Sequence, residues 1–206
     1  ENENLRTAEL ESELSQFKNE VNPQLLYESL ETLLTLIHKN VEEGEDYIDH
    51  LSSVYRYILS HRKVELSSLR EETRAAKNIV HLLNYQFGGR LKLTNLLSEH
   101  FNEAPIVPGT FPNLIEMIVR SSIINQYQPL EIKILNDESE NDFLTIQYRL
   151  NEKLIQDEGT SETFERIQKS YSFYSDKPVV SVKAYDFAYI KIPLLEELEE
   201  PVLDSH

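Results

Sequence analysis

The sequence predicts an α+β protein whose first half is helical and whose second half combines helices with a sheet. Apolar residues recur at helical spacing through most of the first hundred residues. Prolines and a glycine then cluster between Asn102 and Pro112, which is typical of a boundary between domains. Beyond this cluster, short segments alternate apolar and polar residues, as strands do. We therefore expect a helical domain over 21–101 and a second domain over 105–195.

The first twenty residues show the spacing of a coiled coil. Leu10, Leu14, Phe17 and Val21 are separated by four, three and four residues, in a segment that is otherwise polar. This pattern predicts a coiled-coil helix over 1–20. A single amphipathic helix that caps the next domain is the alternative.

Three further helices are expected in the first half. Gly44 interrupts the pattern between the first and the second, and the capping-box sequence from Ser68 to Glu71 begins the third. Pro23 should bend the first helix locally by removing a backbone donor. Residues up to about 100 are thus expected to be helical. The apolar stripes are Leu26, Leu30, Leu33 and Ile37; Ile48, Leu51, Tyr55 and Ile58; and Leu69, Ala76, Val80, Leu83 and Phe87.

The second half is expected to form one sheet covered by helices. Leu114 to Ile123 carry a helical face, and a further helix is expected over 163–174. The acidic tail, 196–206, is expected to be a solvated end. The expected strands are 130–135, 144–150, 180–184 and 188–192.

Composition excludes several classes of function. The net charge of the 206 residues is -16, which argues against nucleic acid or an anionic membrane surface as a partner and favours basic partners. The chain has no cysteine, and its five glycines form no glycine-rich phosphate loop. It has no apolar run near eighteen residues. It begins with Glu1 and has Met117 as its single methionine, so we expect a fragment of a longer protein that could carry membrane spans elsewhere.

Four segments together resemble one family. Residues 22–31 read N-P-Q-L-L-Y-E-S-L-E, which is similar to the phosphoacceptor motif N-P-H-F-L-F-N-S-L-N of LytS-type sensor histidine kinases. The other three are 17–21, 51–57 and 85–91, which resemble L-K-A-Q-I, L-S-D-L-L-R-Y and R-F-G-D-R-L of that family. The likeness extends from about Leu10 to Leu195. It implies a helical dimerisation and phosphoacceptor-like domain, entered by a signalling helix, and then an α/β sandwich like the family's ATPase domain.

The phosphoacceptor position has lost its chemistry. Gln24 stands where the family has its phosphorylated histidine, and an amide has no nucleophilic lone pair comparable to that of a neutral imidazole. The resemblance therefore implies a pseudokinase without a catalytic residue at this position.

The nucleotide motifs are degenerate as well. Residues 118–126 correspond to the family's L-V-E-N-A-I-K-H-G, so Arg120 replaces the Glu and Ser121 replaces the magnesium-binding Asn. Leu150 replaces the Asp that accepts the adenine amino proton. In the last glycine box only Gly159 remains, among acidic residues that would repel phosphate. No cofactor and no metal are expected.

None of the histidines is a clear substitute for the missing phosphoacceptor or a clear metal ligand. Five lie in the helical half, and the spacing of none of them predicts the i, i+4 pair with a carboxylate that a helical metal site would use. His38 is the best substitute acceptor because it shares the first helix with Gln24. It lies fourteen residues downstream, roughly 20 Å along the axis, so a kinase domain positioned for Gln24 would miss it. The five are His38, His50, His61, His81 and His100.

The leading hypothesis is that the chain is the cytoplasmic part of a degenerate LytS-like sensor histidine kinase of two-component signal transduction, and a domain of an inner-membrane protein. It would act as a homodimer and bind a histidine kinase or a response regulator. One alternative is an atypical kinase, active or nucleotide-binding, whose pocket is rebuilt around Arg120 and Asn125. Another is a helical scaffold with no signalling role.

Overall fold

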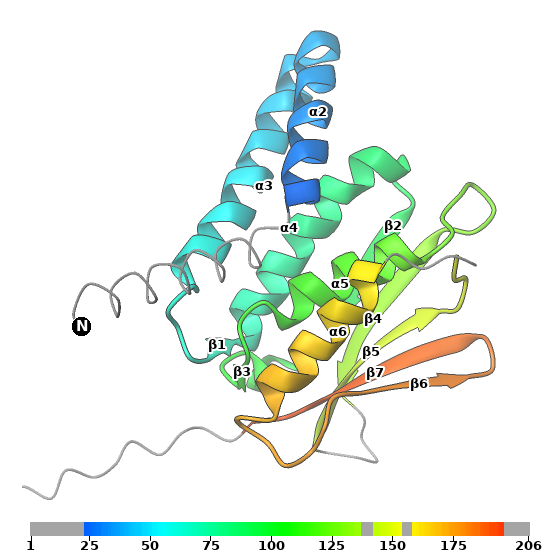
Figure 1. Cartoon of the computed structure of the whole chain (residues 1–206). Helices are drawn as coiled ribbons and strands as arrows, with labels where there is room; N and C mark the ends of the chain where they lie inside the picture. Colours follow the sequence, from blue (N-terminus) through cyan, green and yellow to red (C-terminus); the bar gives the residue numbers. More distant parts are fainter. Residues whose placement is uncertain (1–22, 137–141, 154–157, 196–206) are drawn as a thin grey trace, which may run out of the picture.

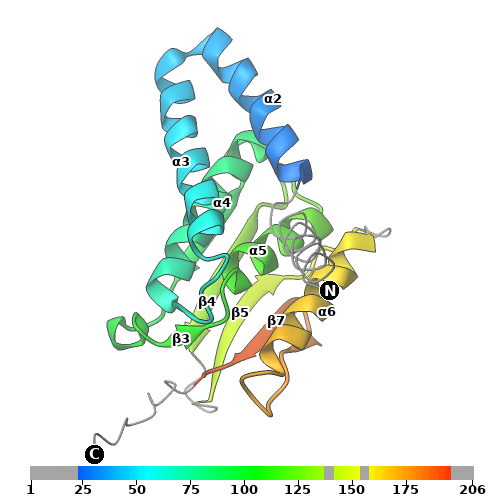
Figure 2. The same cartoon turned by 60° about the vertical axis from the view of Figure 1, so that its left-hand side comes forward.

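A helical hairpin stands on a layer of helices that covers one face of a sheet (Figures 1 and 2). The computed structural model describes residues 23–136, 142–153 and 158–195, so the expected coiled coil over 1–20 and the acidic tail lie outside the described residues. The helices are α2 (Pro23–Lys39), α3 (Val41–Ser60), α4 (Leu69–Phe87), the 3-10 helix η1 (Glu99–Phe101), α5 (Thr110–Ser121) and α6 (Glu158–Tyr171). The strands are β1 (Ser67–Ser68), β2 (Leu91–Asn95), β3 (Pro105–Ile106), β4 (Leu130–Asn136), β5 (Phe143–Arg149), β6 (Val180–Ala184) and β7 (Phe187–Pro193).

The hairpin of α2 and α3 turns at Asn40. The Asn40 side chain accepts hydrogen bonds from the backbone N–H groups of Glu42 and Glu43, as an N-cap residue does. The expected break at Gly44 is wrong, because Gly44 lies inside α3 and is buried. A Cβ atom there would come within 3.1 Å of the Ile37 Cγ1 atom, so glycine allows α2 and α3 to approach closely.

Within the described residues, α2 buries a different face from the expected stripe. The buried side chains are Leu25, Ser29 and Leu36. Of the expected stripe, Leu30 is 44% exposed and Ile37 is 42% exposed. The hairpin therefore leaves an apolar face of α2 uncovered in the single chain. The bend expected at Pro23 involves residues that precede the described part.

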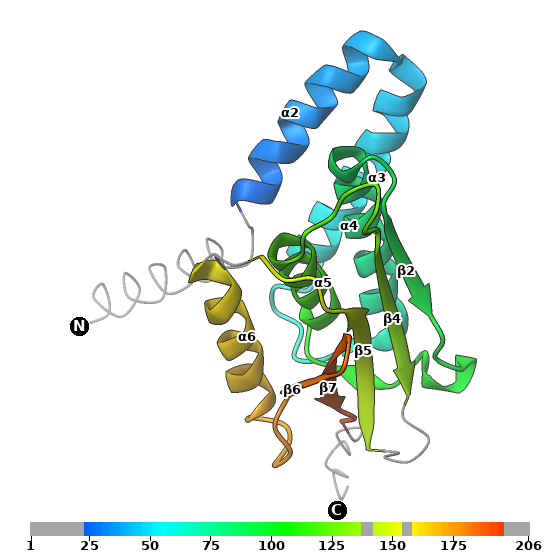
Figure 3. The ribbon, with the colours of Figure 1, turned by 90° about the vertical axis from the view of Figure 1, so that its right-hand side faces the viewer.

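The five-stranded sheet has the order β2-β4-β5-β7-β6, with β2 parallel to β4 and the other pairs antiparallel. Figure 3 shows α4, α5 and α6 on one side of it. Ile134, Ile146 and Ile190 are partners across β4, β5 and β7, and all three are buried. The alternation expected for these strands is thus confirmed, because their apolar residues face the helices.

Two expected elements are corrected. Residues 91–95 are not helical but form β2, since Gly88 ends α4 in the left-handed conformation (φ 60°) and the Asn84 side chain bonds the backbone N–H and carbonyl of Leu91, both at 2.8 Å. The sheet thus includes a strand, β2, that precedes the expected domain boundary. The division of the chain into domains over 21–101 and 105–195 stays a prediction. The helix expected over 163–174 is α6, which begins earlier, at Glu158.

A buried carboxylate fixes the start of α5. Glu72 on α4 accepts the backbone N–H groups of Gly109 at 2.7 Å and Phe111 at 2.8 Å, and the hydroxyl of Tyr57 on α3 also donates to it. Burial raises the pKa of Glu72 to about 8, and the two backbone bonds oppose that rise. Since Glu72 and its donors lie on three elements, α5 is held in one position relative to α3 and α4.

Among the described residues, no helix is long and apolar enough to cross a membrane.

Candidate functional site

Arg120 connects α5 to the hairpin. Its Nη1 and Nη2 atoms donate to the two carboxylate oxygens of Glu28 on α2, at 3.2 and 3.0 Å. Its Nε atom donates to Glu116, one turn earlier on α5, at 2.7 Å. The side chains of Arg120, Glu28 and Glu116 are 18, 27 and 8% exposed. This paired, largely desolvated geometry is the arrangement in which an arginine–carboxylate contact is strongest.

Gln24 extends the same network to the phosphoacceptor-like position. It is exposed on the first turn of α2, and its Nε2 atom donates to Glu28 Oε1 at 2.8 Å. A continuous series of contacts therefore runs from Gln24 through Glu28 and Arg120 to Glu116. It joins two positions that are 96 residues apart in the sequence, from 24 to 120.

The electrostatics favour a charged pair. Burial disfavours the ionised form of Glu28, but hydrogen bonds from Arg120 and Gln24 outweigh it and lower the Glu28 pKa. For Arg120 the effect of burial is likewise outweighed by Glu28 and Glu116, which raise its pKa. Both groups are thus ionised at neutral pH.

The carboxyl end of α5 is joined directly to the chain after β5. Ile123 N–H donates to the Asn151 carbonyl at 2.7 Å, and Lys153 N–H donates to the Ser121 carbonyl at 2.9 Å. The Asn151 side chain also donates to the Ile123 carbonyl at 2.6 Å. Ser122 and Glu152 form an antiparallel bridge between these contacts. The segments that correspond to two of the family's nucleotide motifs therefore bond each other.

The remaining positions expected at a nucleotide site have structural contacts. Ser121 is buried, and its hydroxyl donates to the Ile118 carbonyl at 3.1 Å. Asn125 accepts the N–H groups of Tyr127 and Gln128 in a turn. Leu150 packs against the core. The contacts of Ser121, Asn125 and Leu150 are thus with their own helix, their own turn and the core, and not with one another.

Gly159 lies in the first turn of α6 and is exposed. Its carbonyl accepts the Thr163 hydroxyl at 2.8 Å. The segment that resembles the family's last glycine box is helical from Glu158 onward. It lacks the family's other glycines.

Two of the cavities that described residues form lie beside α5 and on the sheet. One, of about 370 Å³, lies between the hairpin and helices α5 and α6, and it contains none of Arg120, Ser121, Leu150 and Gly159. The other, of about 590 Å³, lies where Lys133 and Gln147 face outward on the sheet, and it contains only Leu150 of those four. The structure thus does not gather the expected nucleotide-site residues around either cavity.

The acidic partners of Arg120 were not predicted from the sequence. Glu116 could have been found, because it lies four residues before Arg120 on the same helix. Glu28 lies four residues after Gln24, but nothing local in the sequence predicts its contact with α5.

The expectation about the histidines is wrong in one respect. Asp46 lies four residues before His50 on α3, and the structure brings His81 of α4 to the same carboxylate. The pair of Asp46 and His50 was detectable from the i, i+4 spacing, whereas the contact with His81 on another helix was not.

Comparisons with known proteins agree with the resemblance at a coarse level. A family model described as histidine kinase matches residues 12–91, which include α2, α3 and α4. The chain is also similar to the sensor histidine kinase YpdA of Escherichia coli (strain K12), with 24% identity over 131 residues, or 64% of this chain. Those residues are 22% of that relative, so the chain spans about a fifth of its length.

One solved structure is more distant. The Acinetobacter baumannii histidine kinase AdeS aligns with a TM-score of 0.41 and 10% identity, over 78% of this chain and 83% of that one. The family model over residues 12–91 and the E. coli relative together support a relationship between this chain and sensor histidine kinases.

Proposed function

We propose that this chain is a LytS-like pseudokinase module that signals by dimerisation and partner binding, without phosphoryl transfer. The observation that carries the proposal is the contact of Arg120 with Glu28. It links the residue that replaces the family's nucleotide-motif Glu to the helix that carries the phosphoacceptor-like position.

The charge of Arg120 supports the loss of metal binding. In the resemblance, Arg120 lies beside the position that would bind magnesium. A cation there repels a divalent ion, and its guanidinium is held by two carboxylates rather than presented to phosphate. Glu28 and Glu116 both bind the arginine, which offsets part of their combined negative charge.

The bonds between 121–123 and 151–153 support the loss of nucleotide binding. They use backbone donors and acceptors of both segments, and opening them would leave partly buried polar groups unpaired. A nucleotide would have to replace these bonds without an aspartate at position 150 or a glycine-rich loop. The alternative of a pocket rebuilt around Arg120 and Asn125 has less support, because the contacts of these two side chains are already structural.

The exposed apolar face of α2 supports a homodimer. Tyr27, Leu30, Leu34, Ile37 and Val41 lie on the hairpin and are 42 to 72% exposed. Such a continuous face, along α2 and onto the start of α3, is typical of an interface. We propose that a second copy covers it, and that the chain is the cytoplasmic part of a longer, membrane-associated protein. A histidine kinase or a response regulator is the proposed partner, and the net charge of -16 favours a basic surface on it.

The test is a calorimetric titration of the chain with ATP and ADP, with and without Mg²⁺. We expect no binding with a Kd below about 1 mM, which corresponds to roughly 4 kcal/mol. An active histidine kinase in the same buffer is the positive control, and circular dichroism checks that the chain is folded. Saturable binding in the micromolar range would overturn the proposal and favour the rebuilt pocket.

A further inference from the structure

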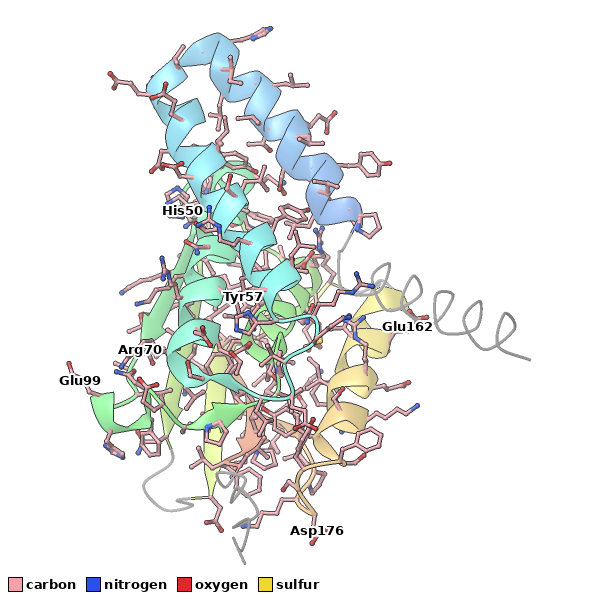
Figure 4. The ribbon with its side chains drawn as sticks, turned by 90° about the vertical axis from the view of Figure 1, so that its left-hand side faces the viewer. His50, Tyr57, Arg70, Glu99, Glu162 and Asp176 are labelled. Carbon is pink, nitrogen blue, oxygen red and sulfur yellow. The ribbon has the colours of Figure 1, made fainter. Side chains whose placement is uncertain are left out.

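Two histidines and one aspartate meet where α3 runs beside α4. Asp46 and His50 are four residues apart and so lie on one face of α3, while His81 comes from α4. Figure 4 shows His50 on α3. The cluster lies away from Arg120 and its partners in the sequence and plays no part in the proposed function.

The three side chains are close enough to share one ion. His81 Nε2 is 2.9 Å from one oxygen of Asp46, and His50 Nε2 is 3.8 Å from the other. One ligand atom from each residue lies within 4.8 Å of the others. The two imidazole rings are stacked with centroids 3.6 Å apart. A bound ion would replace the hydrogen bond between His81 and Asp46 and open the stacked rings slightly.

A fourth residue orients His50. Its Nδ1 atom is 2.8 Å from the Oδ1 atom of Asn78 on α4. A carbonyl oxygen only accepts, so Nδ1 carries the hydrogen and Nε2 keeps its lone pair on the side of Asp46. Metal-binding histidines are commonly fixed in this way by a second hydrogen bond.

We propose that Asp46, His50 and His81 form a binding site for a divalent transition-metal ion such as Zn²⁺. Two imidazole nitrogens and one carboxylate oxygen suit zinc, and water completes a tetrahedral set. Magnesium and calcium prefer oxygen ligands alone, so they fit this donor set poorly. The ion would join α3 of the hairpin to α4, which covers the sheet, and would stabilise their contact.

The site is tested by titrating the untagged, chelator-treated chain with ZnCl₂ in a calorimeter. We expect one ion per chain and no heat with MgCl₂. The variants His50→Ala, His81→Ala and Asp46→Asn should each bind at least about 10-fold more weakly. His38→Ala and His100→Ala remove histidines outside the cluster and should bind as the parent chain does. Circular dichroism of each variant checks folding.

Two further measurements distinguish a site from a simple hydrogen-bonded cluster. Asn78→Ala leaves all three ligands but removes the orienting oxygen, so it should weaken binding about 10-fold. Co²⁺ should give the visible absorption of a tetrahedral complex in the parent chain and lose it in His81→Ala. The proposal is overturned if the parent chain does not bind Zn²⁺, or if the cluster variants bind it as tightly as the controls.

Discussion

At the scale of the residue, Arg120 makes most of the contacts of the candidate site. An arginine at position 120 can reach a carboxylate on its own helix, and this pair with Glu116 follows from the i, i+4 spacing. Its second partner, Glu28, is 92 residues away in the sequence, so no local pattern predicts it. Gln24 and Arg120 could therefore be identified separately from the sequence, but only the contact between Arg120 on α5 and Glu28 on α2 shows that they belong to one network.

Replacing Arg120 should destabilise the fold. Arg120→Met would leave Glu28 and Glu116 close together without their counter-charge. Breaking a fully buried pair costs about 3–5 kcal/mol, and the partial exposure of these side chains reduces our expectation to about 2 kcal/mol. Urea unfolding measures the change. Arg149→Met, at an exposed position on β5, is the matched control and should change stability by less than about 0.5 kcal/mol. Equal stability of the two variants would show that the contact with Glu28 is not formed in solution.

The same network should give a defined pH dependence. The Glu28 pKa is lower in the folded chain than the usual value of 4.5, so the folded state binds fewer protons there than the unfolded state does. The stability contributed by Glu28 is thus present above pH 4.5 and is lost as the pH falls through the folded pKa. Glu28→Gln removes this contribution. The difference in unfolding free energy between the parent chain and Glu28→Gln should be constant from about pH 7 to 5 and shrink below that. A difference that stays constant to low pH would contradict the ion pair.

At the scale of the element, strands were predicted better than helix boundaries. The four expected strands correspond to β4, β5, β6 and β7, because their sequences alternate apolar and polar residues, although no residue of β6 is buried. β2 was missed because it is short, follows a long helix and pairs in parallel with β4, a contact that depends on the whole sheet. Gly44 was misread because glycine usually interrupts helices, whereas here it allows two helices to pack closely.

The exposed face of α2 should control the oligomeric state. Leu30 and Leu34 are four residues apart and are 44 and 63% exposed. Carboxylates placed there would be buried without partners in a dimer and would oppose association. We expect Leu30→Glu/Leu34→Glu to shift the chain toward monomer in sedimentation velocity, while Leu96→Glu, at an exposed site after β2, leaves the dimer unchanged. A double variant that remains dimeric would place the interface elsewhere, and a monomeric parent chain would remove the dimer proposal.

At the scale of the whole molecule, the apolar scaffold of the sheet is preserved while the polar positions of the resemblance have changed. Ile190 and Ile192 are buried in β7, as expected of a closing strand, but Leu150 and Ser121 are held by packing and a helical hydrogen bond. Random loss of function would be expected to affect core and site alike. The proposed function, binding without catalysis, would account for this difference.

Restoring the histidine alone should not restore phosphorylation. Phosphoryl transfer depends on positioning and on charge neutralisation around the γ-phosphate, so a nucleophile without bound Mg-ATP has no donor to attack. Gln24→His should therefore take up no label from radioactive ATP by itself. The position is exposed on the first turn of α2, so an imidazole there would be accessible. In a mixed dimer with an active relative, the same variant should accept phosphate, and Gln24→Ala, the matched control, should not. Label on Gln24→His alone would show that this chain binds and uses ATP, which would overturn the pseudokinase proposal. Absence of label in a mixed dimer shown to form by sedimentation would contradict the expectation that position 24 is accessible to the partner's kinase domain.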